Sequence, residues 1–181
     1  MPSLEPPLWD RARSCCFTGH RPNRLPAVYQ QNPAALQALR AALRDAVLQA
    51  VRAGYDCFLS GMALGTDTWA AEEILSLKEA GYPLWLSAVI PCPEQDARWP
   101  EADRERYHSL LDRADRQVLV CPHYTAYCMH MRNRWMVEHS ARLIAVYGEV
   151  PGGTANTVHL AEKKGLEIVR INPFQSDIFS L

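Results

Sequence analysis

Short apolar runs alternate with helix-like segments along nearly the whole of this chain, and this alternation constrains the fold more than any other feature. Six runs have the length and composition of strands: SCCFTG at 14–19, YDCFLS at 55–60, PLWLSAVIP at 83–91, RQVLVC at 116–121, RLIAVYG at 142–148 and LEIVRI at 166–171. In a parallel sheet, a helix connects one strand to the next. The pattern therefore predicts a Rossmann-like, doubly wound α/β fold with a mainly parallel sheet and helices on both faces.

The clearest helix follows the first strand-like run. It begins near Pro33 and ends at Gly54, where a helix stop is expected, and its apolar stripe consists of Leu36, Leu39, Leu43, Val47 and Val51. Further helices are expected after each later run, including a charged, solvated one within residues 93–115. The length of 181 residues suits one domain over residues 13–181, preceded by a proline-rich, flexible arm at 1–12.

Charge and hydropathy exclude some classes of protein. Lys and Arg number 19 against 20 acidic residues, so there is no overall positive field for binding nucleic acid. The longest apolar stretch, residues 84–90, is too short to span a bilayer, and the N-terminus lacks the apolar core of a signal peptide. We therefore expect a cytoplasmic protein with no membrane partner, whose six cysteines stay reduced.

Three loops that follow strand-like runs are chemically unusual: TGHRP at 18–22, SGMALGTD at 60–67 and GEVPGGT at 148–154. Ligands of doubly wound proteins bind beyond the carboxyl ends of the strands, so these loops should meet at one site. They match neither GxGxxG nor GxxxxGK[ST], the usual dinucleotide and triphosphate motifs. The residues expected to border a ligand in the first two loops are Thr18, Gly19, His20, Arg21, Ser60, Gly61, Gly65 and Asp67.

Each of these loops also has a simpler interpretation. In the third, Gly152 and Gly153 allow close backbone approach, and the helix expected from Thr154 offers free amides to a phosphate. The same tetrapeptide also suits a tight turn with Thr154 as the helix N-cap. Asp67 can accept a hydrogen bond from a ribose hydroxyl or cap its own helix. The residues after the first run can meet a phosphate or a base, or form a turn before Pro22.

Three motifs, in order, resemble one family. CCFTGHRP at 15–22, SGMALGTDTWAAE at 60–72 and RNRWMVEHSARLIAVYGEVPGGTANTVHLA at 132–161 are similar to the YpsA-like branch of the SLOG superfamily. This Rossmann-like group includes the DNA-processing protein DprA and the LOG phosphoribohydrolases. The resemblance extends over residues 14–172 and implies one SLOG-like domain, with a nucleotide or a nucleotide-derived ligand lying across the three loops.

The LOG enzymes allow a comparison by residue. Their MHxRK motif resembles residues 129–133, where Arg132 is kept and Asn133 replaces lysine, which implies that both help to hold a phosphate. Their PGGxGTxxE motif resembles residues 151–159, where His159 takes the place of the catalytic glutamate. Because imidazole is only a partial substitute for a carboxylate, the resemblance favours binding over LOG-type cleavage.

Catalytic and metal sites have weaker signals. Glu72 and His159 are the candidates for acid/base catalysis; Glu72 and Glu73 point about 100° apart on their helix, so one pocket can use only one of them easily. The pairs Cys121/His123 and Cys128/His130 do not have the spacing of a standard zinc motif. We expect buried thiols there and no metal site.

These patterns together predict a protein that binds a nucleotide or nucleotide derivative, ADP-ribose and NAD types included, as a sensor or regulator. One alternative is an N-glycosidase or phosphoribohydrolase-like nucleotide hydrolase. The other is a DprA-like binder of single-stranded nucleic acid, which the balanced charge makes the least expected class. Related proteins often pair, so a homodimer is a further expectation.

Overall fold

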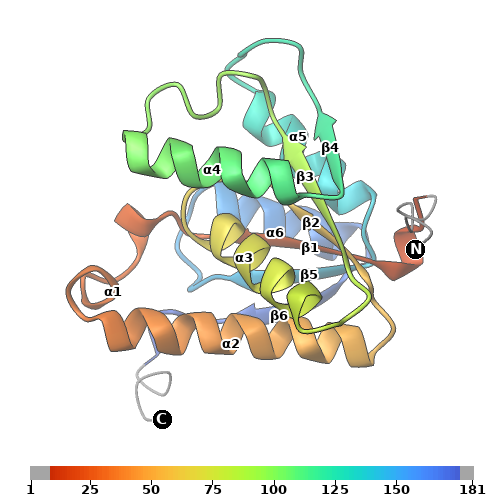
Figure 1. Cartoon of the computed structure of the whole chain (residues 1–181), viewed down its shortest axis with the longest axis horizontal. Helices are drawn as coiled ribbons and strands as arrows, with labels where there is room; N and C mark the ends of the chain where they lie inside the picture. Colours follow the sequence, from red (N-terminus) through yellow and green to blue (C-terminus); the bar gives the residue numbers. More distant parts are fainter. Residues whose placement is uncertain (1–8, 176–181) are drawn as a thin grey trace.

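The fold is built around one parallel sheet, shown in Figure 1. The computed structural model describes residues 9–175, and within them six strands lie in the order β4-β3-β2-β1-β5-β6, each pair of neighbours parallel. The strands are β1 (Ser14–Gly19), β2 (Cys57–Ser60), β3 (Trp85–Ile90), β4 (Arg116–Leu119), β5 (Arg142–Val146) and β6 (Glu167–Ile171). The doubly wound α/β fold predicted from the sequence is therefore confirmed, and the described sheet is parallel throughout.

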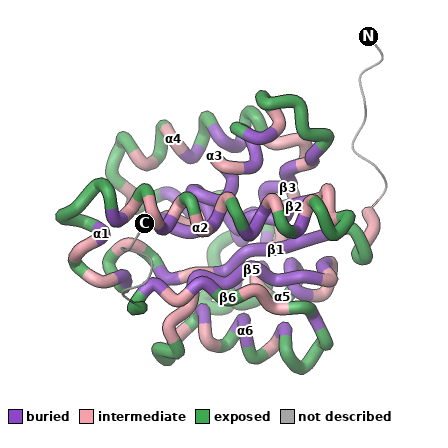
Figure 2. Tube along the Cα trace, turned by 90° about the horizontal axis from the view of Figure 1, so that it is seen from below, coloured by how far each residue is buried: buried purple, intermediate pink, exposed green. Residues whose placement is uncertain are grey.

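Helices cover both faces of the sheet, as Figures 1 and 2 show. On one face lie α2, α3 and α4, and on the other lie α5 and α6. The helices are η1 (Arg11–Arg13), η2 (Pro22–Arg24), α1 (Val28–Gln31), α2 (Pro33–Arg52), α3 (Thr66–Glu79), α4 (Glu101–Arg113), α5 (Cys128–Glu138) and α6 (Gly153–Lys163). The α2 helix starts where the sequence predicts, since the Asn32 side chain accepts a hydrogen bond from the Ala34 amide and Pro33 occupies the first turn.

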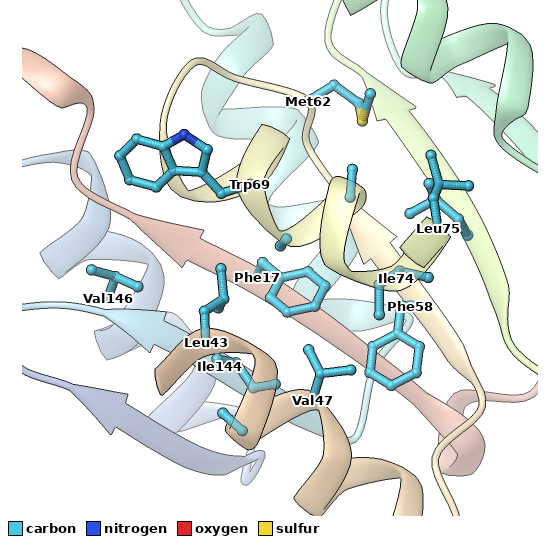
Figure 3. Packing of buried hydrophobic residues seen from close by; sticks show 14 of the residues in the cluster. Phe17, Leu43, Val47, Phe58, Met62, Trp69, Ile74, Leu75, Ile144 and Val146 are labelled. Carbon is cyan, nitrogen blue, oxygen red and sulfur yellow. The ribbon is translucent and has the colours of Figure 1, made fainter. Parts of the chain in front are cut away.

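The central strands are buried on both sides, which explains their continuous apolar sequences. Phe17 of β1 points into the core beneath α2 and α3, whereas its neighbour Cys16 joins the core beneath α5 and α6. Figure 3 shows the first of these cores, where Phe17 and Phe58 stack with ring centroids 6.0 Å apart. Each such fully buried side chain contributes about 1.5–3 kcal/mol to stability.

Strand order reverses at β1, and this reversal determines where a ligand can bind. The chain runs outward from β1 through β2 and β3 to β4, and then returns to place β5 on the other side of β1. The connections after β1 and β5 consequently diverge onto opposite faces and leave a crevice between them at the carboxyl edge.

The expected N-terminal arm is only partly described, because residues 1–8 lie outside the described range. Trp9 packs edge-on against Trp135 with ring centroids 5.1 Å apart, and the Arg116 guanidinium lies 4.9 Å from the Trp9 ring centroid. The end of the expected domain, residues 176–181, also lies outside the described range. Among the helices of residues 9–175, none combines the length and apolarity needed to cross a bilayer.

Candidate functional site

A cavity of about 310 Å³ lies in the crevice at the carboxyl edge of the sheet. Its walls come from the loops after β1 and β2, from α5 and from the first turn of α6. The lining residues are Thr18, Gly19, His20, Arg21, Arg24, Ala63, Asp67, Met129, Arg132, Asn133, Gly153 and Thr154. Segments far apart in the sequence thus contribute to one site.

Most of the residues selected from the sequence line this cavity, and the others lie in the loops that carry the lining residues. Those in the lining are Thr18, Gly19, His20, Arg21, Asp67, Arg132, Asn133, Gly153 and Thr154. Ser60, Gly61, Gly65 and Gly152 do not line it. The Ser60 hydroxyl accepts a hydrogen bond from the Met62 amide at 3.1 Å and donates one to the Asp67 carbonyl at 2.8 Å, which fixes the loop after β2.

The first turn of α6 points its amides toward the cavity. Gly152 precedes the helix with φ 147°, a backbone conformation that favours glycine, and no side chain caps the helix start. Gly153 and Thr154 lie in the lining, and the Thr154 hydroxyl forms no hydrogen bond with residues 9–175. An uncapped helix start combines free N–H groups with a partial positive charge, so it can bind an anion.

Arg132 is the buried cation of the site, with 4% of its surface exposed. Its Nη1 donates to the Gly61 carbonyl and lies 3.9 Å from Asp67 Oδ2, and its Nε donates to Asn133 Oδ1 at 2.7 Å. Nη2 forms no hydrogen bond with any of residues 9–175, so it is the available donor. Burial lowers the pKa of Arg132 and raises the pKa of Asp67, and each charge partly offsets the effect of burial on the other.

A chain of hydrogen bonds joins Arg132 to the start of α6. Asn133 accepts from Arg132 and donates through Nδ2 to the Thr157 hydroxyl at 3.0 Å. The Thr157 hydroxyl in turn donates to the Gly153 carbonyl at 2.9 Å. The guanidinium and the helix amides are therefore held in a fixed relation, which lowers the entropic cost of binding an anion between them.

Two glycines are required by close packing under the cavity. A Cβ on Gly61 would lie 2.5 Å from Arg132 Cζ and 2.7 Å from Asp67 Oδ2, and a Cβ on Gly19 would clash with the Thr66 side chain. Because Gly61 has no side chain, Arg132 can contact the loop after β2. Because Gly19 has none, α3 can pack closely against β1.

His20 is a buried group in the cavity wall, 3% exposed. Burial, and secondarily the charge of Arg24, lowers the pKa of His20 below its ordinary value of 6.5. Its Nε2 lies 3.4 Å from the Gly148 amide and accepts that hydrogen. A neutral ring in this geometry carries its proton on Nδ1.

The two catalytic candidates from the sequence are not part of the cavity. Glu72 forms ion pairs with Arg40 at 3.0 Å and Arg106 at 2.5 Å, on the face covered by α2, α3 and α4. His159 lies on α6, on the opposite face, with a side chain 66% exposed and Nδ1 3.6 Å from Glu162 Oε2. The helix register directs Glu72 toward neighbouring arginines and His159 toward solvent, so they cannot act on one substrate.

Sequence reasoning missed three lining residues: Arg24, Ala63 and Met129. Arg24 donates from Nη1 to the Pro151 carbonyl at 3.3 Å, across the cavity mouth. It follows Arg21 by one turn of η2, so the spacing of the two arginines around Pro22 and Asn23 was a usable signal. Ala63 and Met129 lie within the motifs at 60–67 and 129–133, but neither side chain carries a polar or charged group.

The cysteines near α5 form a small apolar cluster, as expected. Cys121 and Cys128 are buried together with Cys92, and Cys128 Sγ lies 3.7 Å from Cys92 Sγ. His123 and His130 are exposed. Within the described part of the chain, no three His, Cys, Asp or Glu side chains are grouped so as to hold a metal ion.

Comparisons with known proteins agree with this architecture. The model of the YspA SLOG family matches residues 15–174. A UPF0398 protein of Halalkalibacterium halodurans is 27% identical over 151 residues, covering 82% of this chain and 79% of that one. A UPF0398 protein of Bacillus pumilus is 30% identical over 132 residues, covering 72% of this chain and 70% of its own length.

Two solved structures share the fold. The DNA processing protein A (DprA) of Streptococcus pneumoniae superimposes with a TM-score of 0.60 at 16% identity, covering 93% of this chain and 53% of DprA. The DprA of Helicobacter pylori, whose structure concerns its single-stranded DNA binding mode, superimposes with a TM-score of 0.57 at 17% identity. The alignment covers 91% of this chain and 67% of that DprA chain. This chain therefore spans about half the length of pneumococcal DprA.

Proposed function

Since this chain belongs to the YspA SLOG family, a group whose fold supports a nucleotide-related or nucleic-acid-related role, we propose that it binds a nucleotide or nucleotide derivative and releases it intact. The phosphate lies against the first turn of α6. Arg132 Nη2 supplies the buried countercharge, and Arg21 and Arg24 supply exposed ones at the mouth. The protein acts as a sensor or regulator.

One observation carries this proposal: the uncapped start of α6 and an arginine with an available Nη2 line the same cavity and are linked by hydrogen bonds through Asn133. Both groups prefer an anion with several oxygens. A phosphate accepts hydrogen bonds from both at once, whereas a neutral ligand gains less from the partial positive charge of the helix start and from the exposed Arg21 and Arg24.

Binding without cleavage is supported by the carboxylates. Asp67 is the one carboxylate among the described lining residues. Its Oδ2 accepts from the Ala63 amide at 3.4 Å and faces Arg132 at 3.9 Å. A carboxylate engaged in this way holds the loop and the guanidinium, and neither Glu72 nor His159 lines the cavity to complete an acid/base pair.

The test is calorimetric titration of the full chain with ribose 5-phosphate, AMP and ADP-ribose, followed by chromatography of the recovered ligand. Arg24→Gln and Thr154→Val remove an exposed cation and a hydroxyl from the lining at little structural cost. We expect each to weaken ribose 5-phosphate binding about 3- to 10-fold. The matched controls Arg52→Gln and Thr125→Val, on exposed residues outside the cavity, should bind as the unmodified protein does.

Two results would overturn the proposal. If none of the three ligands binds, or if the lining variants bind as tightly as the controls, the cavity is not a phosphate site. If free base accumulates during incubation, the protein is an N-glycosidase and not a sensor.

A second candidate function is the binding of single-stranded nucleic acid. The balanced net charge made this class the least expected, but the DprA likeness makes that expectation doubtful. A groove of about 300 Å³ between α5 and α6 contains His130, Arg134, His159 and Lys163 and meets the first cavity at Asn133. Such a cationic groove suits a phosphate backbone.

Fluorescence anisotropy with a labelled oligonucleotide distinguishes the two functions. A nucleic-acid binder should lose affinity steeply as salt rises, and Arg134→Gln with Lys163→Gln should weaken it further. A mononucleotide binder should show oligonucleotide affinity no higher than that for AMP.

A further inference from the structure

A second cavity, of about 410 Å³, adjoins the first. The two share Arg21 and Met129 in their linings, so they meet at the mouth of the phosphate cavity. The walls of the second cavity come from the turn at residues 93–99 after β3 and from the segment between β4 and α5. Both segments follow strands at the same edge of the sheet, so one ligand can extend across both cavities.

Two aromatic side chains form apolar walls of this second cavity. Trp99 is half-buried and packs edge-on against Tyr107, with ring centroids 5.3 Å apart, which fixes its orientation. Tyr124, from the other segment, lines the same cavity and is 63% exposed. A cavity with one exposed and one fixed aromatic ring in its lining suits a planar aromatic ligand, because stacking is the preferred contact of such rings.

Gln95 lies in the same lining, and only its side-chain nitrogen, not its side-chain oxygen, has a hydrogen-bond partner among residues 9–175. The side chain is 6% exposed, and its Nε2 donates to the Gly61 carbonyl at 3.1 Å. Because a carbonyl can only accept, this contact fixes the orientation of the amide. Gln95 Oε1 is covered from solvent and has no hydrogen-bond partner among residues 9–175. A buried acceptor without a partner is uncommon and marks a position where a ligand can supply a donor.

The turn that carries Gln95 is held rigidly. Asp96 accepts hydrogen bonds from Arg104 at 3.3 Å and His108 at 2.9 Å, and both lie on α4. The Trp99 amide donates to the Asp96 carbonyl at 2.9 Å. The backbone of the segment that carries both Gln95 and Trp99 is therefore anchored to α4.

We propose that the second cavity is a base subsite selective for nucleobases that carry an exocyclic amino group. The ring lies between Trp99 and Tyr124, and its amino group donates to Gln95 Oε1. Arg21, shared by both cavities, lies beside the sugar and phosphate. Since Oε1 is covered, the Gln95 side chain or its cover shifts when the base enters. This inference rests on the proposed phosphate site and adds the identity of the base to it.

The experiment is calorimetry on the full chain with four probes: ribose 5-phosphate, AMP, purine riboside 5′-monophosphate and IMP. Purine riboside 5′-monophosphate differs from AMP only in lacking the amino group, and IMP replaces that group by an oxygen. We expect AMP to bind about fivefold tighter than purine riboside 5′-monophosphate, the value of one neutral hydrogen bond, and IMP to bind no tighter than the latter.

Single substitutions test the contacts with the base without affecting the phosphate site. Gln95→Met keeps the length of the side chain and should bring AMP and purine riboside 5′-monophosphate within twofold of each other. Tyr124→Ala, at an exposed residue, should weaken AMP binding by fivefold or more and leave the affinity for ribose 5-phosphate unchanged. Tyr127→Ala, also exposed but outside this lining, is the control and should bind AMP normally.

The outcomes are distinct. If ribose 5-phosphate binds but AMP binds no tighter, the base subsite is overturned and the phosphate site stands. Equal affinities for AMP and purine riboside 5′-monophosphate overturn the role of Gln95. If ribose 5-phosphate itself does not bind, both the phosphate site and the base subsite fail.

Discussion

Substituting alanine for Gly61 tests how tightly the buried guanidinium is packed against the loop after β2. The new Cβ would lie 2.5 Å from Arg132 Cζ and 2.7 Å from Asp67 Oδ2, whereas ordinary contacts begin near 3.4 Å. Arg132 Nη1 would lie closer still, so the guanidinium must withdraw by more than about 1 Å, which breaks its hydrogen bond to the Gly61 carbonyl. Overpacking costs about 1–3 kcal/mol, and a hydrogen bond to a charged group contributes about 1.5–3 kcal/mol.

We expect Gly61→Ala to lower the free energy of unfolding by the sum of these contributions, about 2.5–6 kcal/mol, which for a chain of this size corresponds to a Tm lower by about 5–25 °C. Urea denaturation followed by far-UV circular dichroism measures this. The control is Gly153→Ala, where a Cβ would meet nothing within 4 Å. It should be neutral or stabilise by about 0.4–1 kcal/mol, because alanine restricts the unfolded chain.

A double-mutant cycle shows whether the clash is with Arg132. In an Arg132→Met background, the more flexible side chain can give way, so Gly61→Ala should cost at least about 1 kcal/mol less than in the unmodified protein. If Gly61→Ala stays within about 0.5 kcal/mol of the unmodified protein, the range of ordinary surface substitutions, the reasoning about close packing at this position is refuted.

Three other predictions follow from the same geometry. Arg132→Met should lower the free energy of unfolding by about 3–5 kcal/mol, because it leaves Asp67 buried without a countercharge. The double variant that also carries Asp67→Asn should recover part of this loss, as measured by urea denaturation. The free energy of unfolding should fall as the pH drops below 6.5, because burial lowers the pKa of His20 in the folded protein and the unfolded chain therefore binds the proton more readily. His20→Gln should reduce the dependence of the free energy of unfolding on pH between about pH 7.5 and 5.5. Glu72→Gln and His159→Gln should leave the calorimetric Kd for ribose 5-phosphate within twofold of its unmodified value, whereas a tenfold change in either would restore the hydrolase interpretation.

The sequence predicted the sheet well because its strands have a strong local signal. Residues 143–146 are apolar at every position, and so short an apolar run is typical of a strand covered on both faces. The start and end of α2 were equally clear, since Pro33 and Gly54 are local signals for helix boundaries. The loops after β1, β2 and β5 were placed together by topology alone, because the carboxyl ends of parallel strands share one edge.

Helix register limited the prediction of chemistry. Glu72 was chosen because it lies near the start of α3, but α3 packs between α2 and α4, so its side chain meets Arg40 and Arg106. The local sequence does not indicate which arginine of another helix a glutamate will contact. His159 was chosen by its motif position, and its exposure depends on the rotation of α6 relative to α5.

Gln95 shows the same limit for binding sites. Its sequence neighbourhood, a charged loop before α4, predicts only a solvated surface, and the side chain becomes informative only when Gly61 from the loop after β2 engages its Nε2. Gly61 accepts hydrogen bonds from both Gln95 and Arg132, so one backbone carbonyl aligns the proposed base acceptor with the proposed phosphate donor. A substitution that moves this carbonyl should therefore alter the affinity for phosphate and the preference for an amino group together, whereas a change at Tyr124 should alter only the contribution of the base.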